Sequence, residues 1–456
     1  MKTKVLVTAL TAALTVSLAA CSSSQTSPPS AAPNASALQS AAGVTDISIW
    51  HGLSAANGKA FQHAVDGFNA ANQGKIHVTA TYQGVYADLL AKYTAAIRSQ
   101  STPTVVLGGD IALGFLTDSK QVLPAAQMAQ GQPGILNLDD LSPQAVNYYK
   151  VDGVQQGVPM NVSTPVLWVN RDILTKAGLA ADAPLKTLDE VVAAAKTIKT
   201  KTGIAGFSTQ DDDWYIEQLT ASAGQDFCTT DNGRKGAAPT GITINQGLAK
   251  QNITKISDLY ASGVAVDGSA NGSAAISAFQ AGKVGMIIMS SGILGALKTG
   301  PKFNYQTLPY PTSGPAGQSG PVVGGAGLYL SRGASPAQQV AGWKLEAYLT
   351  SPQVQEDFSH ATGYVPINVK TADLTTQKTY LAANPDSQLF YNQLTKTTVV
   401  SASAGCVSGA MQTIKTSNMA EITAAWAGQK SIDSALDAAA AKATTELQQY
   451  KQQLGN

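Results

Sequence analysis

The chain has 456 residues, 44% hydrophobic and 13% charged, which is enough apolar material for a buried core in two or three domain-sized units. Its 30 basic and 29 acidic residues leave a formal net charge of +1, so nothing indicates binding to nucleic acid or to an acidic membrane surface. The four histidines lie far apart and form no metal-binding spacing, so we expect no metal and no cofactor.

The first residues have the pattern of an export signal. Lys2 and Lys4 precede an apolar run, Val5 to Ala20, that is short for a membrane span and is followed directly by serines. The end of this run, with Cys21 next, resembles the lipobox of bacterial lipoproteins. That resemblance implies cleavage before Cys21 and a diacylglycerol on its thiol, which would anchor the protein to the cell membrane. An ordinary secreted protein with a chance cysteine is the alternative.

The next segment predicts a tether. Ser22 to Gly43 consists mainly of Ser, Ala and Pro and carries no charged or aromatic side chain. Such a segment cannot bury enough apolar area to offset its ordering entropy. We therefore expect a signal peptide over 1–20 and a lipidated cysteine with a flexible tether over 21–44.

From Thr45 onward, strand patterns alternate with helix patterns, which predicts an α/β fold with a parallel sheet. Thr187 to Glu190 form a capping box, and Ser335 with Pro336 marks another helix start. The expected strands are 47–50, 76–82, 104–107, 166–169 and 284–289, and the expected helices lie around 61–68, 86–98, 187–199, 274–281, 335–348 and 431–454.

Loops rich in Gly and small polar residues lie where several of these strands end. In open α/β sheets, ligands bind beyond the carboxyl ends of the strands, where backbone N–H groups can face hydroxyls or an anion. We therefore expect the binding site to draw on four loops, Trp50-His51-Gly52, Gly108-Gly109-Asp110, Ser290-Ser291-Gly292 and Gly324-Gly325-Ala326.

Two cysteines remain beyond Cys21. In an exported protein Cys228 and Cys406 meet an oxidising compartment, which favours a disulfide between them. The alternative is two unpaired thiols buried as small hydrophobic side chains.

Several ordered stretches, spread over about 47–454, resemble the family 1 extracellular solute-binding proteins of carbohydrate ABC importers, most of all the branch that binds glycerol 3-phosphate and glycerophosphodiesters. The most specific are Thr81–Tyr86, Val158–Leu167, Lys176–Leu179, Pro309–Pro311 and Thr362–Ile367.

This resemblance implies a non-enzymatic, extracytoplasmic binding protein with the two-lobed periplasmic-binding-protein fold (type II, maltose-binding-protein-like), with a hinge and an interlobe cleft. Lobe one is expected at 45–164 plus 332–372 and lobe two at 165–331 plus 373–456. The expected partners are a small-molecule substrate and the permease subunits of an importer with a cytoplasmic ATPase. We expect a monomer that touches the membrane only through its lipid.

The resemblance also implies the residues that contact the ligand: Tyr86, Asp110, Ser163, Ser290, Gly325, Tyr364 and Lys415. The serines, the tyrosine hydroxyls and the Gly325 N–H can donate to phosphate oxygens, Lys415 supplies a positive charge, and Asp110 can accept from glycerol hydroxyls. Each of these residues has an ordinary structural alternative, such as a core tyrosine, a turn glycine or a solvated lysine.

Three departures from the branch leave room for a phosphodiester or a neutral sugar as the ligand. Lys415 and Asp110 stand where relatives usually carry Arg and some carry Glu, and Leu188 stands where some carry Trp and so leaves room. Trp214 is expected to stack on a sugar face or a quaternary ammonium, with a core position as its alternative. We therefore expect a glycerophosphodiester such as glycerophosphocholine.

The alternatives are a neutral sugar or oligosaccharide, a secreted hydrolase, and an adhesin or sensor domain. The sequence lacks a Gly-x-Ser-x-Gly elbow, an HExxH motif and a phosphate-binding Gly-Lys-Ser/Thr loop, which argues against the hydrolase. Asp211, Asp212 and Asp213 are expected to form a loop of solvated carboxylates rather than a metal site.

Overall fold

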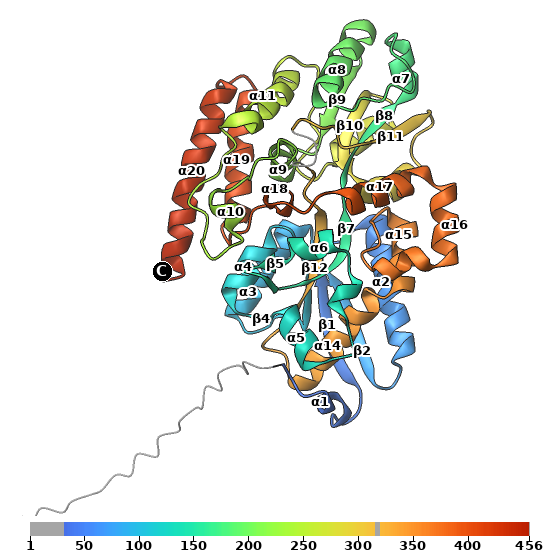
Figure 1. The fold of residues 1–456 in the computed structure, drawn as a ribbon, viewed down its shortest axis with the longest axis vertical. Helices are drawn as coiled ribbons and strands as arrows, with labels where there is room; N and C mark the ends of the chain where they lie inside the picture. Colours follow the sequence, from blue (N-terminus) through green and yellow to red (C-terminus); the bar gives the residue numbers. More distant parts are fainter. Residues whose placement is uncertain (1–31, 315–319, 456) are drawn as a thin grey trace, which may run out of the picture.

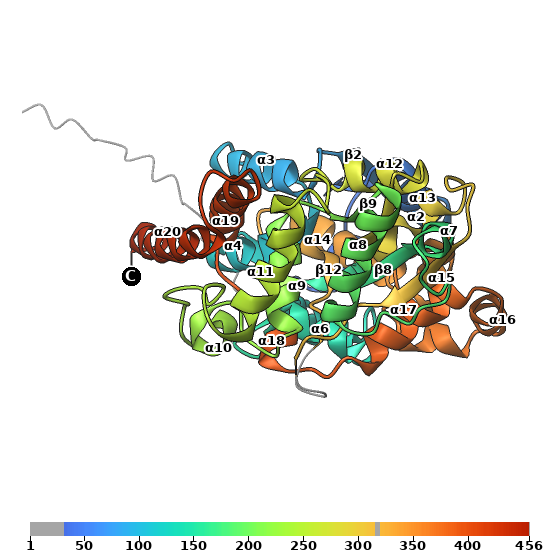
Figure 2. The same ribbon diagram turned by 90° about the horizontal axis from the view of Figure 1, so that it is seen from above.

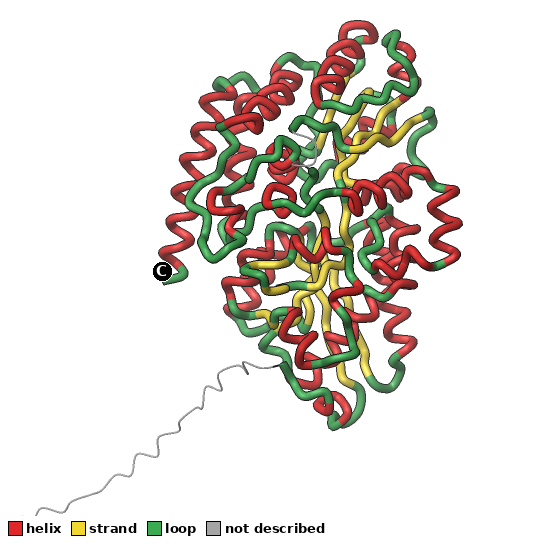
Figure 3. The backbone as a smooth tube through the Cα atoms, in the orientation of Figure 1, coloured by secondary structure: helices red, strands yellow, loops and turns green. Residues whose placement is uncertain are grey.

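Two larger β-sheets, one in each lobe, and a small two-stranded sheet organise the chain in a computed structural model that describes residues 32–314 and 320–455 (Figure 1). Strands form the centre of each lobe and helices surround them (Figure 3). Cys21 and the expected signal peptide lie outside the described residues. Among the described residues, no helix is long and apolar enough to cross a membrane.

Lobe one contains the strands β1 (Thr45–His51), β2 (Ile76–Tyr82), β3 (Val105–Gly109), β4 (Val122–Leu123), β5 (Lys150–Val151), β6 (Val154–Gln155), β7 (Val158–Ser163) and β12 (Gly324–Ser331). Its helices are α1 (Ser36–Gln39), α2 (Ala55–Ala71), α3 (Tyr86–Arg98), α4 (Ala112–Ser119), α5 (Ala125–Gly131), η1 (Leu138–Asp140), α6 (Pro143–Tyr148), α14 (Pro336–Leu349), α15 (Pro352–Thr362) and η3 (Val369–Asp373).

Lobe two contains the strands β8 (Pro165–Asn170), β9 (Ala205–Thr209), β10 (Val284–Ser290) and β11 (Tyr305–Pro309). Its helices are α7 (Arg171–Lys176), α8 (Leu188–Thr202), α9 (Asp213–Ala221), α10 (Thr229–Gly233), α11 (Gly247–Ala261), α12 (Ser273–Gln280), η2 (Ser291–Ile293), α13 (Leu294–Leu297), α16 (Thr375–Ala383), α17 (Pro385–Lys396), α18 (Ser401–Ala404), α19 (Met411–Trp426) and α20 (Ile432–Gln453). Both views of the ribbon place α19 and α20 on the side opposite α16 (Figures 1 and 2).

Both of the larger sheets contain parallel and antiparallel pairs of strands, so the expectation of a parallel sheet is only partly right. The sheet of lobe one has the order β2-β1-β3-β12-β4, with β7 also on β12; β1, β2 and β3 are parallel, whereas β12 runs antiparallel to its neighbours. The sheet of lobe two has the order β11-β8-β10-β9, in which only β9 and β10 are parallel.

The position of β12 corrects the expected lobe boundary. The predicted division placed 165–331 in lobe two, but residues 324–331 pair with β3, β4 and β7 in the sheet of lobe one. The chain therefore returns to lobe one between β11 and β12, before residue 324. The direction of β12 and its place in lobe one depend on partners that lie far away in the chain, so no local sequence pattern indicates them.

The tether prediction is wrong for its described part. Residues 36–39 form α1, which packs against α14, and Ala32 and Leu38 pack against the core of lobe one. The Gln132 side chain also donates a hydrogen bond to the Pro33 carbonyl. A segment with few apolar residues can still dock where an existing surface offers apolar and hydrogen-bonding partners.

Local capping signals agree with the structure. Thr187 and Glu190 form the expected capping box at α8, and Ser335 forms a second one with Gln338 at the start of α14. The Ser431 side chain caps α20. These contacts satisfy N–H groups that have no partner inside the helix, which is why short-range sequence patterns mark helix starts well.

A disulfide joins Cys228 and Cys406, whose Cα atoms lie 5.6 Å apart. Near it, the buried Arg234 guanidinium donates to the backbone carbonyls of Tyr148 at 2.7 Å and Gly405 at 2.6 Å. Burial lowers the pKa of Arg234 to about 10, so it remains charged at neutral pH. Residues 404–406 are thus tied both to lobe two, through the disulfide, and to lobe one, through Arg234.

Removal of the disulfide should lower the free energy of unfolding. The two cysteines lie 178 residues apart, and closing so long a loop contributes about 5 kcal/mol in the chain-entropy model. Urea unfolding of the Cys228→Ser/Cys406→Ser variant should show a loss approaching this size. Reductant should destabilise the wild-type protein and leave the variant unchanged; equal responses would contradict a native disulfide.

A buried carboxyl group in α14 gives a pH dependence that can be measured. Glu346 is 1% exposed, its Oε1 has no hydrogen-bond partner in the described structure, and burial raises its pKa to about 8. Because the folded state holds this proton more tightly than the unfolded state, its stabilising contribution is complete below about pH 4.5 and is lost as the pH rises through about 8. Glu346→Gln should flatten the decline of unfolding free energy over this range. An unchanged slope would contradict this assignment.

Candidate functional site

At the edge of the sheet of lobe one that faces lobe two, the carboxyl ends of β3 and β7 lie beside the amino end of β12. Ala326, near the start of β12, pairs with Gly109 at the end of β3, so Asp110 follows directly at this edge. Gly324 pairs with Ser163 at the end of β7. Residues 324–326 were expected to form a loop that follows a strand, but they are the first residues of β12. They still lie at the same edge of the sheet, because β12 runs antiparallel to β3 and β7.

Gly325 has a backbone conformation that residues with a side chain rarely adopt. Its φ is +109°, and a Cβ atom there would overlap the Asn161 carbonyl oxygen. The backbone of β12 therefore passes against β7 with no room for a side chain at position 325.

Tyr86, which is half-buried, and the buried Tyr364 interact beside this edge. The Asn161 side chain donates a hydrogen bond of 3.0 Å to the Tyr86 hydroxyl, while the Asn161 Oδ1 has no partner in the described structure. Burial raises the pKa of both tyrosines, so both are neutral donors at physiological pH. A Cβ on Gly292 would lie 3.0 Å from the Tyr364 ring, which places this ring against the loop after β10 in lobe two.

The edge of lobe two contributes Ser290 and Trp214. Because β9 and β10 are parallel, their carboxyl ends lie at the same edge of the sheet. Ser290 is the last residue of β10, and Trp214 lies in the first turn of α9, the helix that follows β9. The Ser290 hydroxyl accepts the Gly292 N–H at 3.1 Å. The Trp214 ring reaches lobe one, because a Cβ at position 324 would lie 2.9 Å from it and 2.8 Å from the Ser163 hydroxyl. The buried Trp214 Nε1 has no hydrogen-bond partner among the described residues.

The central feature of the site is an ion cluster that joins the lobes. The Lys415 ammonium group on α19 lies 3.1 Å from an Asp110 carboxylate oxygen of lobe one and 3.2 Å from a Glu217 carboxylate oxygen on α9 of lobe two. Burial lowers the pKa of Lys415, but the two carboxylates outweigh burial, and the pKa lies well above its ordinary value. Lys415 is therefore a permanent cation held between two lobes.

Sequence reasoning missed Glu217. Its partner Lys415 lies 198 residues further along the chain, and no local motif distinguishes Glu217 from the other carboxylates. The only usable signal was its place four residues after Asp213 on one helix, which puts both carboxyl groups on the same face of α9.

Two aspartates next to the cluster correct a further expectation. Asp212 and Asp213 are not in a solvated loop: Asp212 caps α9 by accepting the Trp214 N–H at 2.7 Å, and Asp213 is 1% exposed and accepts from Asn418 at 3.3 Å. Burial raises the pKa of Asp212 and raises that of Asp213 further, while Lys415 lowers both. The surroundings of Lys415 are thus rich in carboxyl groups. The described residues include no group of three His, Cys, Asp or Glu side chains arranged to hold a metal ion.

Leu188 does not join this cluster. It is 2% exposed and packs in the hydrophobic core of lobe two, where its backbone N–H donates to the Thr312 carbonyl. The structure therefore gives no support to Leu188 as a ligand contact. The other eight expected contacts meet between the lobes, directly or through Asn161, Gly292 and Gly324.

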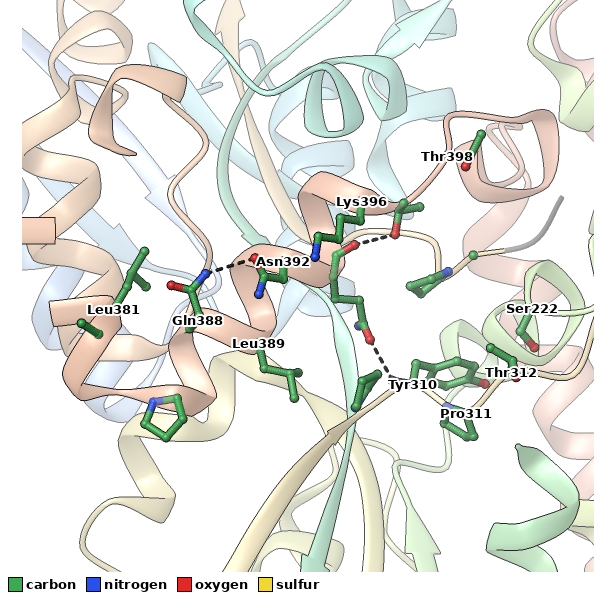
Figure 4. A pocket seen from close by; sticks show the side chains of 17 residues that line it. Ser222, Tyr310, Pro311, Thr312, Leu381, Gln388, Leu389, Asn392, Lys396 and Thr398 are labelled. Atoms are coloured by element: carbon green, nitrogen blue, oxygen red, sulfur yellow. Dashed lines mark hydrogen bonds between the residues drawn. The ribbon is translucent and has the colours of Figure 1, made fainter. Parts of the chain in front are cut away.

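A cavity of about 760 Å³ lies elsewhere, between α17 and the segment that follows β11 (Figure 4). Tyr310, Leu389 and Asn392 are among the residues that line it, and Gln393 donates from there to the Thr164 hydroxyl and the Pro165 carbonyl, where the chain first crosses between the lobes. None of the nine expected contact residues lines this cavity. A small cavity of about 10 Å³ lies beside Tyr86.

Comparison with known proteins gives a consistent family. Residues 63–388 match the family described as bacterial extracellular solute-binding protein. The sn-glycerol-3-phosphate-binding periplasmic protein UgpB of Agrobacterium fabrum is 29% identical over 76% of this chain and 79% of its own length. Its namesake in Yersinia pseudotuberculosis is 26% identical over 91% of this chain and 94% of its own length.

Solved structures show the same fold. UgpB from Mycobacterium tuberculosis in complex with glycerophosphocholine has a TM-score of 0.74 at 20% identity and covers 89% of this chain and 98% of its own. The GacH receptor of Streptomyces glaucescens, solved unliganded and with acarbose, also has a TM-score of 0.74 at 21% identity and covers 89% of this chain and 99% of its own.

The solved structures agree with the two lobes and their mixed sheets, and the matched family model shows that the chain belongs to the bacterial extracellular solute-binding proteins.

Proposed function

We propose that this protein is the lipid-anchored, extracytoplasmic binding component of an ABC importer and that its solute is a glycerophosphodiester such as glycerophosphocholine. The observation that carries this proposal is the Lys415 ammonium group held between Asp110 and Glu217 where the lobes meet. The protein would hold the solute between the lobes and deliver it unchanged to the permease subunits, whose cytoplasmic ATPase drives transport. The anchor would be a diacylglycerol on Cys21.

Charge favours a diester over a monoester. One ammonium group faces two carboxylates, those of Asp110 and Glu217. A phosphate monoester carries up to two negative charges, which such a site would repel, whereas a diester carries one. A diester with a cationic head group adds no net charge and can place its phosphate near Lys415 and its cation near the carboxylates.

The neutral groups suit the rest of such a solute. Ser163, Ser290 and the two tyrosine hydroxyls can exchange hydrogen bonds with glycerol hydroxyls or phosphate oxygens. The Trp214 ring, which lies against Gly324, offers a flat face to a quaternary ammonium, a contact worth about 0.5–2 kcal/mol. The relatives support this choice. Two are named as glycerol-3-phosphate-binding proteins, and the mycobacterial relative was solved in complex with glycerophosphocholine.

A neutral oligosaccharide is the second candidate. The same hydroxyl, carboxylate and tryptophan groups bind sugars well, and a neutral sugar adds no charge to a site that already holds more carboxylates than cations.

Calorimetry and thermal unfolding of the delipidated protein should distinguish the candidates. We expect glycerophosphocholine to bind with one-to-one stoichiometry and without turnover. At 100 times its dissociation constant it should add about 2.7 kcal/mol to the free energy of unfolding. The proposal fails if a neutral di- or trisaccharide binds at micromolar strength while glycerophosphodiesters and glycerol 3-phosphate produce no heat.

Replacement of Lys415 should distinguish a phosphodiester from a sugar as the solute. Lys415→Ala removes a charge-assisted hydrogen bond worth about 1.5–3 kcal/mol, so glycerophosphocholine should bind roughly 10- to 150-fold more weakly. Lys415→Arg should retain most of the affinity. Lys430→Ala, which removes a lysine paired with Glu421 away from the cleft, is the matched control and should leave affinity unchanged. Equal losses for phosphodiester and sugar would place Lys415 outside the phosphate site.

A further inference from the structure

We propose that Glu217 determines the charge selectivity of the cleft, by cancelling the attraction of Lys415 for doubly charged phosphates so that the protein takes solutes with no net charge. This inference rests on the proposed function, because it names the class of solute accepted at the same site. It assigns a role to a residue that no motif identifies and that would not need to touch the solute.

Glu217 is held in place by contacts at both of its carboxylate oxygens. Oε1 accepts the Cys406 N–H at 2.8 Å, and Oε2 lies 3.2 Å from the Lys415 ammonium group. The side chain is 2% exposed. A Cβ on Gly405, whose φ is +74°, would lie 3.0 Å from Oε1, so the backbone of this segment also packs against the carboxylate. Because the disulfide fixes Cys406, the carboxylate cannot turn away from Lys415 when a solute enters.

One carboxylate would be enough to pair with Lys415, and the structure supplies two. Asp110 alone, at 3.1 Å, already gives Lys415 a partner from the other lobe. Adding Glu217 makes the cluster formally negative, since one ammonium group then faces two carboxylates. Arg234 also interacts electrostatically with Glu217, but its guanidinium donates to the carbonyls of Tyr148, Lys150 and Gly405, whereas the ammonium group of Lys415 pairs directly with the two carboxylates.

The consequence for binding follows from charge interactions in a poorly hydrated site. Two like charges several ångströms apart repel by a few kcal/mol at the effective dielectric constant of protein sites, and a dianion feels this repulsion twice. A zwitterion or an uncharged solute has no net interaction of this kind. Glu217 therefore acts as a positioning and charge-balancing residue whose removal should help anions and leave neutral solutes nearly unchanged.

The first experiment uses Glu217→Gln, which keeps the shape and the acceptor for the Cys406 N–H but removes the charge. Calorimetry should show glycerol 3-phosphate binding about tenfold or more tightly than to the wild-type protein, while the affinity for glycerophosphocholine changes by less than about threefold. Inorganic phosphate should follow glycerol 3-phosphate. Glu217→Asp, which keeps the charge, should keep the preference of the wild-type protein for glycerophosphocholine.

Glu421→Gln is the matched control. It removes the same charge from a largely buried side chain on α19, but Glu421 pairs with Lys430 and Lys442 rather than with Lys415. It should alter no affinity. A merely structural role for Glu217 would instead weaken the binding of all solutes together, without changing the ratio between them.

A series of solutes tests the inference on the wild-type protein alone, should a variant fail to fold. Glycerophosphocholine should bind more tightly than the methyl phosphodiester of glycerol, a monoanion, and this diester more tightly than glycerol 3-phosphate. The inference is overturned if glycerol 3-phosphate binds the wild-type protein as tightly as glycerophosphocholine, or if Glu217→Gln gains no affinity for glycerol 3-phosphate or phosphate. Loss of the proposed function looks different, because there the wild-type protein binds no glycerophosphodiester at all.

Discussion

The buried ammonium group of Lys415, held by one carboxylate from each lobe, is the contact on which the rest of the site depends. Removing one partner of a buried ion pair commonly costs about 3–5 kcal/mol, because the remaining charge is left unpaired. In this protein the partners Asp110 and Glu217 belong to different lobes, so the same contact that satisfies the cation also holds the lobes together. Any solute that enters has to share or replace these interactions.

The topology brings these partners together from distant parts of the chain. Asp110 and Lys415 are 305 residues apart, and they meet because β3 ends, and the antiparallel β12 begins, at the edge that faces lobe two. The disulfide and Arg234 hold residues 404–406 beside this meeting point, and Arg234 also donates to the Tyr148 carbonyl of lobe one. Under the proposed function, the residues that bind the solute are the same few that hold the two lobes together.

The sequence predicted well those features that depend on neighbouring residues. The strand 76–82 and the helix 86–98 have the predicted bounds, because alternation and helical spacing are local properties. The predicted capping box at Thr187 and the predicted N-cap at Ser335 are confirmed for the same reason. Features that depend on distant partners were wrong or absent, including the direction of β12 and its place in lobe one.

For the candidate site, too, the residues in recognisable sequence motifs were predicted better than those that depend on distant packing. The residues that came from ordered family motifs, such as Ser163 and Tyr364, lie between the lobes, whereas Leu188, chosen for the space it would leave, packs in a core. The charge balance could not be predicted, because Glu217 becomes visible only when α9 and α19 are packed together. An aspartate expected in solvent, Asp213, is buried for the same reason.

The most direct measurement is a crystal structure of the delipidated protein with glycerophosphocholine bound. The account predicts the phosphate within hydrogen-bonding distance of the Lys415 ammonium group, the choline group beside Trp214, and Glu217 still bonded to the Cys406 N–H. Glycerophosphocholine bound instead in the cavity between α17 and the segment after β11, with the Lys415 cluster unoccupied, would contradict it.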